Sequence, residues 1–181
     1  MVTIENAPQD RSASPTSPDT GWLAKYLRLA LIAGVVIIAD QVTKFIILRD
    51  VGLHTAIPVI PGFFQITHVQ NPGGAFGFLA NQSALVRGIL FLAVSTVAVG
   101  LVVWFYHKTP PTHRWLAAGF ALIFGGAIGN LIDRVRIGRV VDFLDFYIGR
   151  WHWPAFNVAD SAITIGITIF IIHVIAGRMP D

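Results

Sequence analysis

Cysteine is absent from this sequence of 181 residues. Its absence excludes disulfide bonds, thiol catalysis and cysteine-ligated metal sites. The histidines offer no alternative metal site, because neither His54 nor His68 is followed by a second ligand at helical or zinc-site spacing. We therefore expect both of these histidines to lie on the surface, and we expect no metal and no other cofactor.

Charged residues are also scarce. They make up only 13% of the chain, against 54% hydrophobic residues, which makes a soluble globular domain improbable. The formal net charge is +3, but the basic residues are scattered singly and do not alternate with aromatics in a stripe, so we expect no nucleic-acid partner. Membrane lipids with anionic headgroups are the expected neighbours.

The N-terminal residues 1–22 mix proline, serine, threonine and acids without apolar periodicity, which predicts a disordered tail. They lack the features of a cleaved secretory signal peptide, so the first apolar segment is expected to remain as an anchor. Four apolar segments follow that are long enough to span a membrane. We expect an all-α polytopic membrane protein, with one domain over residues 23–177, helices at about 23–48, 84–106, 114–133 and 156–176, and a short tail at 178–181.

Two segments between these helices are expected to lie outside the hydrocarbon. Prolines and glycines interrupt every apolar run in residues 49–83, and the alternation in residues 63–69 predicts one or two short strands. Residues 135–156 form the second segment, in which Trp151 and Trp153 suit the headgroup layer. Helix three carries Gly125 and Gly129, a pair of small residues that lets a neighbouring helix approach closely.

Four aspartates near the C-terminal half stand in or next to apolar runs: Asp133, Asp142, Asp145 and Asp160. An ionisable group at membrane depth costs several kcal/mol and calls for an explanation. Each aspartate could simply pair with a nearby arginine at positions 134, 136 and 139. Alternatively, two carboxylates in one site share a proton, so that one becomes an acid and the other a base, and such a pair can activate water.

The motifs around these aspartates resemble a known family. GGAIGNLIDR at 125–134, GRVVDF at 138–143 and FNVADSAI at 156–163 are similar to motifs of the lipoprotein signal peptidases, which are membrane-embedded aspartic proteases of bacteria. Upstream, DQVTK at 40–44 and HVQNPGGAFGF at 68–78 match the two earlier motifs of that family in the right order. The resemblance covers residues 24–177, and the ordered set of five motifs makes it specific.

The resemblance implies an enzyme of the bacterial cytoplasmic (inner) membrane. Its members remove the signal peptide from prolipoproteins by cleaving before a diacylglyceryl-modified cysteine. It also implies two cytoplasmic termini, an active site near the outer face, and a small extramembrane β-sheet that cradles the substrate there. The count of basic residues on the two sides does not decide this orientation. We expect a monomer.

The resemblance also suggests roles for particular residues. Asp40 and Lys44, one helical turn apart, suit an intrahelical ion pair, and their family counterparts support the active site. Asn71 is by default a turn residue before Pro72 and Gly73, but the family match makes this turn a substrate or active-site contact. We further expect Asn71, Asn130, Arg134 and Asn157 to orient peptide carbonyls and the developing oxyanion.

The catalytic pair predicted from the sequence is Asp142 and Asp160. Asp142 lies among apolar residues, where desolvation should raise its pKa, and it matches the VVDF aspartate of the family. Asp133 instead adjoins Arg134 in a run of three arginines, which favours a permanently ionised carboxylate and a supporting role. Asp145 has no family counterpart that we can assign.

Two other classes of function are compatible with parts of the sequence. Intramembrane acids and bases also mark ion pathways, as in a proton-coupled membrane carrier or channel. Against this, the chain lacks an internal repeat, and its acids lie near helix ends. A non-catalytic assembly factor could use the glycine-rich third helix to dock partners.

Overall fold

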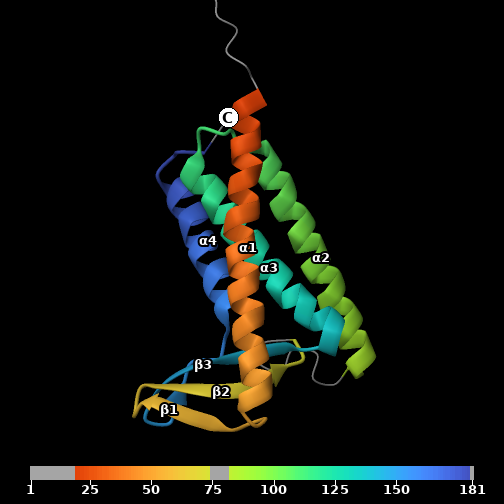
Figure 1. Cartoon of the computed structure of the whole chain (residues 1–181), viewed down its shortest axis with the longest axis vertical. Coiled ribbons are helices and arrows are strands. Elements are labelled where there is room, and N and C mark those ends of the chain that lie inside the picture. Colours follow the sequence, from red (N-terminus) through yellow and green to blue (C-terminus); the bar gives the residue numbers. More distant parts are fainter. Residues whose placement is uncertain (1–18, 74–81, 180–181) are drawn as a thin grey trace, which may run out of the picture.

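Four long helices run side by side, and a small β-sheet lies across one end of them (Figure 1). The computed structural model describes residues 19–73 and 82–179. The helices are α1 (Asp19–Asp50), α2 (Ala84–Lys108), α3 (Arg114–Ile137) and α4 (Val158–Ile175). All four are long and apolar enough to cross a membrane. Together with the sheet, they confirm the predicted fold class.

Two helix ends differ from the prediction. Helix α1 begins at Asp19, inside the segment predicted as a disordered tail, and the side chain of Lys25 lies 4.4 Å from the centre of the Trp22 ring, which gives the first turns a packing partner. Helix α3 continues beyond Asp133 to Ile137 and ends at Gly138, which has a φ of 70°. Arginines do not end a helix, whereas a glycine in the left-handed conformation does.

Helix α3 packs against each of the other three helices. A Cβ atom on Gly125 would lie 2.9 Å from Cα of Ala33 in α1, and one on Gly129 would lie 2.6 Å from Oδ2 of Asp40. Neither distance is possible for a real side chain, so α1 and α3 can approach this closely only because both positions are glycine. The close approach predicted for this glycine pair is confirmed.

The sheet contains four antiparallel strands in the order β1 (Ala56–Ile60), β2 (Phe64–Asn71), β3 (Val140–Ile148) and β4 (Trp151–His152). Strand β2 covers most of residues 63–69, where one or two strands were predicted, whereas β1 lies just before them, in residues for which no strand was predicted. Strands β3 and β4 lie in residues 135–156, for which the sequence predicted no strand. Most of β3 is buried, so its residues form an almost continuous apolar run without the alternation that signals a strand.

Strand β3 joins the sheet to the helices. Val141 and Phe143 of β3 pack in a buried cluster with Ile47 of α1 and Val51 just after it. His68 of β2 lies under the same end of α1, where its Nδ1 is 2.8 Å from the carbonyl oxygen of Val51. The expectation of a surface position was therefore wrong for His68, which is buried, and right for His54, which is exposed.

Candidate active site

The polar residues predicted for the site meet where α1, α3 and α4 reach the sheet. Helix α1 contributes Asp40 and Lys44, and α3 contributes Asn130, Asp133 and Arg134. The remaining residues are Asn71 at the end of β2, Gly73 after it, Asp142 on β3, and Asn157 and Asp160 at the start of α4. Five segments that are distant in sequence therefore converge on one polar cluster.

Asp160 is held by the start of its own helix. Asn157 is the N-cap of α4, and its Oδ1 accepts a hydrogen bond of 2.9 Å from the backbone N–H of Asp160. In return, Oδ2 of Asp160 accepts a bond of 3.3 Å from the backbone N–H of Asn157. This reciprocal arrangement is a capping box, which satisfies two otherwise unpaired donors of the helix. It also fixes the Asp160 carboxylate relative to Asn157.

Asn157 connects this helix start to Asp142. Its Nδ2 group, which is completely buried, donates a hydrogen bond of 2.8 Å to Oδ1 of Asp142. The other carboxylate oxygen, Oδ2, accepts a bond of 3.1 Å from Nδ2 of Asn71. Asp142 is thus held from both sides by neutral amides, which add no positive charge to the site.

The pKa of Asp142 is raised to about 7, first by burial and second by the nearby charge of Asp160. The hydrogen bonds from Asn71 and Asn157 and the charge of Lys44 oppose this shift without cancelling it. The prediction that desolvation raises this pKa agrees with the structure. A carboxyl group with such a pKa carries a proton for much of the time near neutral pH.

Asn130 links Asp160 to the lysine of α1. Its Nδ2 donates a bond of 2.7 Å to Oδ1 of Asp160, while its Oδ1 accepts bonds from Lys44 at 2.9 Å and from Asn157 at 3.2 Å. Because Lys44 can only donate, the amide of Asn130 must turn its oxygen toward the lysine and its nitrogen toward Asp160. The lysine therefore sets which group of Asn130 faces the carboxylate.

Lys44 is almost fully buried and uses all three of its donors. Its Nζ lies 2.8 Å from Oδ2 of Asp40 and 2.8 Å from Oδ2 of Asp133, and the third bond goes to Asn130. The ion pair predicted between Asp40 and Lys44 is present. For Asp133 the sequence left open a pairing with a nearby arginine, but the ion-pair partner in the structure is Lys44 of α1.

The two supporting aspartates also bind backbone groups. Asp40 accepts a bond of 2.9 Å from the backbone N–H of Ala159 in α4, and Asp133 accepts one of 3.2 Å from that of Val141 in β3. Each carboxylate therefore contacts a residue that is one position from Asp160 or Asp142. This geometry ties the positions of both candidate catalytic residues to the buried lysine.

The sequence analysis missed Gln41. Its Nε2 group lies 3.2 Å from Asp40, 3.1 Å from Asp133 and 3.1 Å from the carbonyl oxygen of Gly129. Gln41 stands inside the DQVTK motif, but it directly follows Asp40 and is not one helical turn from it. A search for pairs on one helix face could not detect it.

The remaining site residues line the surroundings of Asp160. Arg134 donates a bond of 3.1 Å to the backbone oxygen of Asn130, and both residues line a cavity of about 270 Å³ that reaches Asp160. A second cavity, of about 510 Å³, borders Asp160 from the side of Trp153 and Ile165. Asp160 can therefore be approached from two sides.

Gly73 shapes the turn that carries Asn71. It has a φ of 93°, which disfavours other residues, and its N–H donates a bond of 2.9 Å to Oδ1 of Asn71. This bond leaves the amide nitrogen of Asn71 free to face Asp142. The rest of the motif, residues 74–78, lies outside the described part of the chain.

Asp145 belongs to a different group of residues on the sheet. Its carboxylate accepts a bond of 2.6 Å from Gln65 and lies 3.0 Å from Nδ1 of His152. In the described ranges 19–73 and 82–179, no three histidine, aspartate or glutamate side chains are grouped so that they could hold a metal ion. The two carboxyl groups of Asp142 and Asp160, linked through Asn157 and Asn130, form an arrangement suited to acid and base chemistry on a water molecule.

Comparisons with known proteins agree with this chemistry. Residues 32–176 match the family model described as Signal peptidase (SPase) II. The lipoprotein signal peptidase of Desulforapulum autotrophicum is 55% identical over 86% of this chain and 96% of its own length, and that of Syntrophus aciditrophicus is 48% identical over 84% and 96%. A solved bacterial membrane enzyme is 36% identical, with a TM-score of 0.72, over 82% of this chain and 87% of its own.

The contacts of Lys44 generate a stability prediction. Lys44→Met should lower the free energy of unfolding by about 3–5 kcal/mol, because it leaves two buried carboxylates without a counter-charge. The matched control is Arg49→Met, which removes an exposed cation paired with Asp50 at 2.7 Å and should change stability little. Thermal unfolding in detergent measures both, and equal unfolding temperatures for the two variants would contradict the role given to Lys44.

Proposed function

Since this chain belongs to the signal peptidase II family, we infer that it is an aspartic endopeptidase of the bacterial inner membrane that removes signal peptides from prolipoproteins. The observation that carries the mechanism is the link between Asp142 and Asp160 through Asn157 and Asn130. We propose these two aspartates as the catalytic pair, and cleavage before the diacylglyceryl-modified cysteine as the reaction.

In this mechanism the pair shares one proton, which Asp142 carries. Asp160 takes a proton from a water molecule as the water oxygen attacks the scissile carbonyl carbon, and Asp142 gives its proton to the carbonyl oxygen. A hydroxyl group of the tetrahedral intermediate then returns its proton to Asp142 as the C–N bond breaks, and the leaving amine takes the proton from Asp160, which restores the pair. The raised pKa of Asp142 supports its role as the acid.

The amides and Arg134 would position the peptide. Asn71 and Asn157 already donate to Asp142, and the cavity lined by Arg134 reaches Asp160. Fixed donors of this kind need no reorganisation when negative charge develops on the carbonyl oxygen. All these groups come from one chain, which supports a monomer as the active unit.

A carrier or channel is not favoured. The acids cluster at the sheet end of the helices, and Lys44 forms ion pairs with both Asp40 and Asp133. A path for protons across the membrane would need further acceptors toward the other end, where the described part of the chain has no aspartate or glutamate apart from Asp19, the first residue of α1.

The site itself generates a prediction about mutants. Asp142→Asn and Asp160→Asn should each lower turnover of a diacylglyceryl-modified precursor by about 10³-fold or more, because neither amide can transfer the shared proton. The double mutant should be hardly worse, since the pair acts as one unit. Cleavage of the precursor in detergent, followed on gels, measures this turnover, and an unlipidated precursor serves as the negative control.

The controls for this experiment are other aspartates of the chain. Asp145→Asn should be mild, because Asp145 contacts Gln65 and His152 and not the pair. Asp133→Asn should lower activity through its loss of contact with Lys44. Near-normal turnover by Asp142→Asn together with an inactive Asp133→Asn would move the catalytic pair to Asp133 and Asp160.

The pH dependence of cleavage follows from the pKa of Asp142, which is raised to about 7. Above this value Asp142 loses the shared proton, so kcat/KM should fall as the pH rises, approaching tenfold per pH unit. A fluorogenic lipopeptide assayed from pH 6 to about 9 measures the profile, with circular dichroism as the control for folding. A rate that stays constant across this range would rule out Asp142 as the proton donor.

We further propose that both termini lie in the cytoplasm and that the sheet lies on the outer face of the membrane. The described ends of the chain are both at the end of the bundle opposite the sheet (Figure 1), so one assignment fixes the other. The orientation itself rests on the family resemblance.

Single cysteines can test this orientation, because the chain contains none of its own. Gln82 and Thr112 are both exposed and lie at opposite ends of α2 and its flanking turns. In intact spheroplasts an impermeant thiol reagent should label Gln82→Cys at once and Thr112→Cys only after permeabilisation. The reverse pattern would invert the proposed topology.

A further inference from the structure

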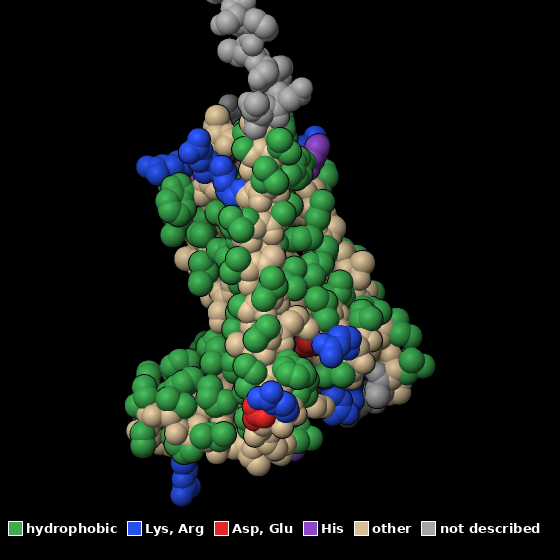
Figure 2. All heavy atoms as spheres, viewed as in Figure 1, with side chains coloured by type: hydrophobic (Ala, Val, Ile, Leu, Met, Phe, Trp, Pro, Cys, Tyr) green, Lys and Arg blue, Asp and Glu red, His purple; other side chains and the backbone are tan. Residues whose placement is uncertain are grey.

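Acidic side chains gather toward the sheet end of the bundle, whereas basic side chains occur at both ends. Apart from Asp19, the first residue of α1, the aspartates of the described residues lie toward the sheet: Asp40, Asp50, Asp133, Asp142, Asp145 and Asp160. The opposite end carries a set of basic residues: Lys25, Arg28, Lys108, Arg114 and Arg178. In the face shown in Figure 2, lysine and arginine side chains occur near the upper end without acids, and the acids lie in the lower part.

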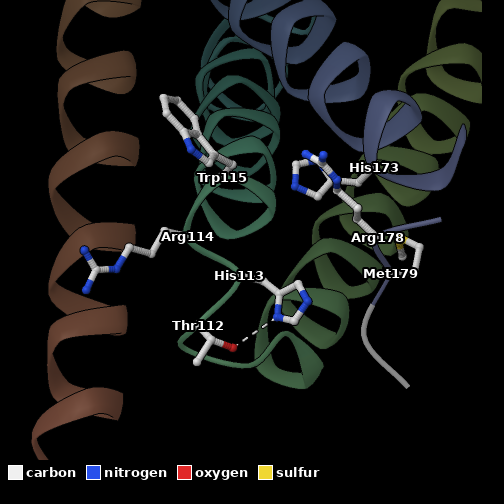
Figure 3. A pocket seen from close by; sticks show the side chains of 7 residues that line it. All are labelled: Thr112, His113, Arg114, Trp115, His173, Arg178 and Met179. Atoms are coloured by element: carbon white, nitrogen blue, oxygen red, sulfur yellow. Dashed lines mark hydrogen bonds between the residues drawn. The ribbon is translucent and has the colours of Figure 1, made fainter. Parts of the chain in front are cut away.

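A pocket at this basic end lies between the start of α3 and the end of α4. Its volume is about 410 Å³, and its lining includes His113 and Arg114 at the start of α3, His173 of α4, and Arg178 and Met179 beyond α4. We call it the basic pocket. Figure 3 shows the imidazoles of His113 and His173 on the same side as Arg178 and Met179, whereas Arg114 extends in the other direction.

The cationic groups of this pocket are available to a ligand. Within the described residues, the Arg178 guanidinium has no hydrogen bond or ion pair with the protein. His173 uses Nδ1 to contact the carbonyl oxygen of Ile169 at 2.9 Å, and His113 uses Nδ1 to contact the Thr112 hydroxyl at 3.2 Å. Nε2 of each ring has no such partner among the described residues and can face a ligand.

An apolar groove adjoins the basic pocket. This groove, of about 220 Å³, runs between α2 and α3 and is lined by Trp104, Phe105, Leu116 and Phe120, with Lys108 at its edge. Met179 lines both the groove and the basic pocket, so the two are adjacent. A ligand that fills both must combine a negative group with a hydrocarbon chain.

The position of the two cavities identifies the source of such a ligand. They lie at the ends of helices that span a membrane, and Trp115 beside them is 75% exposed, as is typical of a side chain in the headgroup layer. Basic pockets between membrane helices select anionic lipid headgroups. We propose that this end of the protein binds one anionic phospholipid, with its phosphate in the basic pocket and an acyl chain in the apolar groove.

Native mass spectrometry of the purified full chain in detergent tests the proposal with dioleoyl phosphatidylglycerol as the probe. We expect one tightly retained molecule and markedly weaker retention of dioleoyl phosphatidylcholine, which has no net charge. Arg178→Gln should weaken phosphatidylglycerol binding about fivefold, from the usual contribution of one basic residue at a membrane surface. Met179→Asp, which places a negative charge where the two cavities join, should abolish the preference.

Two variants serve as matched controls. Arg114→Gln removes the same charge at the same end of the bundle, but its side chain extends away from the other basic groups (Figure 3), so its effect should be clearly smaller than that of Arg178→Gln. Arg150→Gln removes an exposed arginine at the sheet end and should have no effect. Cleavage activity should persist in all four variants, because none alters the candidate active site.

Three results would overturn the proposal. Equal losses for Arg114→Gln and Arg178→Gln would show a general attraction between charges and no defined pocket. Equal retention of phosphatidylcholine would show that the headgroup charge is not recognised. Complete displacement of the lipid by millimolar inorganic phosphate would show a site for free phosphate, in which the apolar groove plays no part.

Discussion

The ammonium group of Lys44 is the interaction on which the polar end of this bundle depends. It is buried with the carboxylates of Asp40 and Asp133, and it has a hydrogen bond for each of its three protons. Burying three charges is tolerable only when the geometry satisfies all of them. Asp40 accepts the backbone N–H of Ala159 in α4 through its other oxygen, and Asp133 accepts that of Val141 in β3 through the oxygen that also contacts Lys44. The lysine therefore indirectly holds those two elements in place.

This arrangement separates the two aspartates that contact the lysine from the proposed catalytic residue Asp142. Asp40 and Asp133 face the lysine directly, whereas Asp142 is surrounded by the amides of Asn71 and Asn157. A buried carboxyl group that is held by neutral amides can keep a proton, and burial raises the pKa of Asp142 to about 7.

The helix start at Asn157 combines structural and chemical tasks. The capping box that begins α4 is made by Asn157 and Asp160, and the same two side chains reach Asp142 and Asn130. Loss of Asn157 would therefore remove the cap of the α4 terminus and the hydrogen bond that holds Asp142 in the proposed catalytic pair. Placing an acid in the first turn of a helix also fixes it with little conformational freedom, because the backbone itself supplies a donor.

Local chemistry in the sequence determined the four spans, the membrane setting and the candidate residues. Apolar length alone predicts a spanning helix, and the spacing of Asp40 and Lys44 alone predicts their ion pair, because both depend on residues close in sequence. The glycine pair of α3, Gly125 and Gly129, likewise predicted a close contact with a neighbouring helix. The ordered motifs were enough to predict the family.

Only the tertiary structure decided which distant groups meet. The partner of Asp133 is a lysine in another helix, and the neighbouring arginines made the wrong pairing look favourable in the sequence. The sequence also did not predict the role of Gln41, because this residue has no partner on its own helix face. It did not predict strand β3, because most of that strand is buried and its residues do not alternate between polar and apolar. Sequence patterns report on neighbours along the chain, whereas a buried charge is neutralised by whichever group the packing of helices brings within about 3 Å.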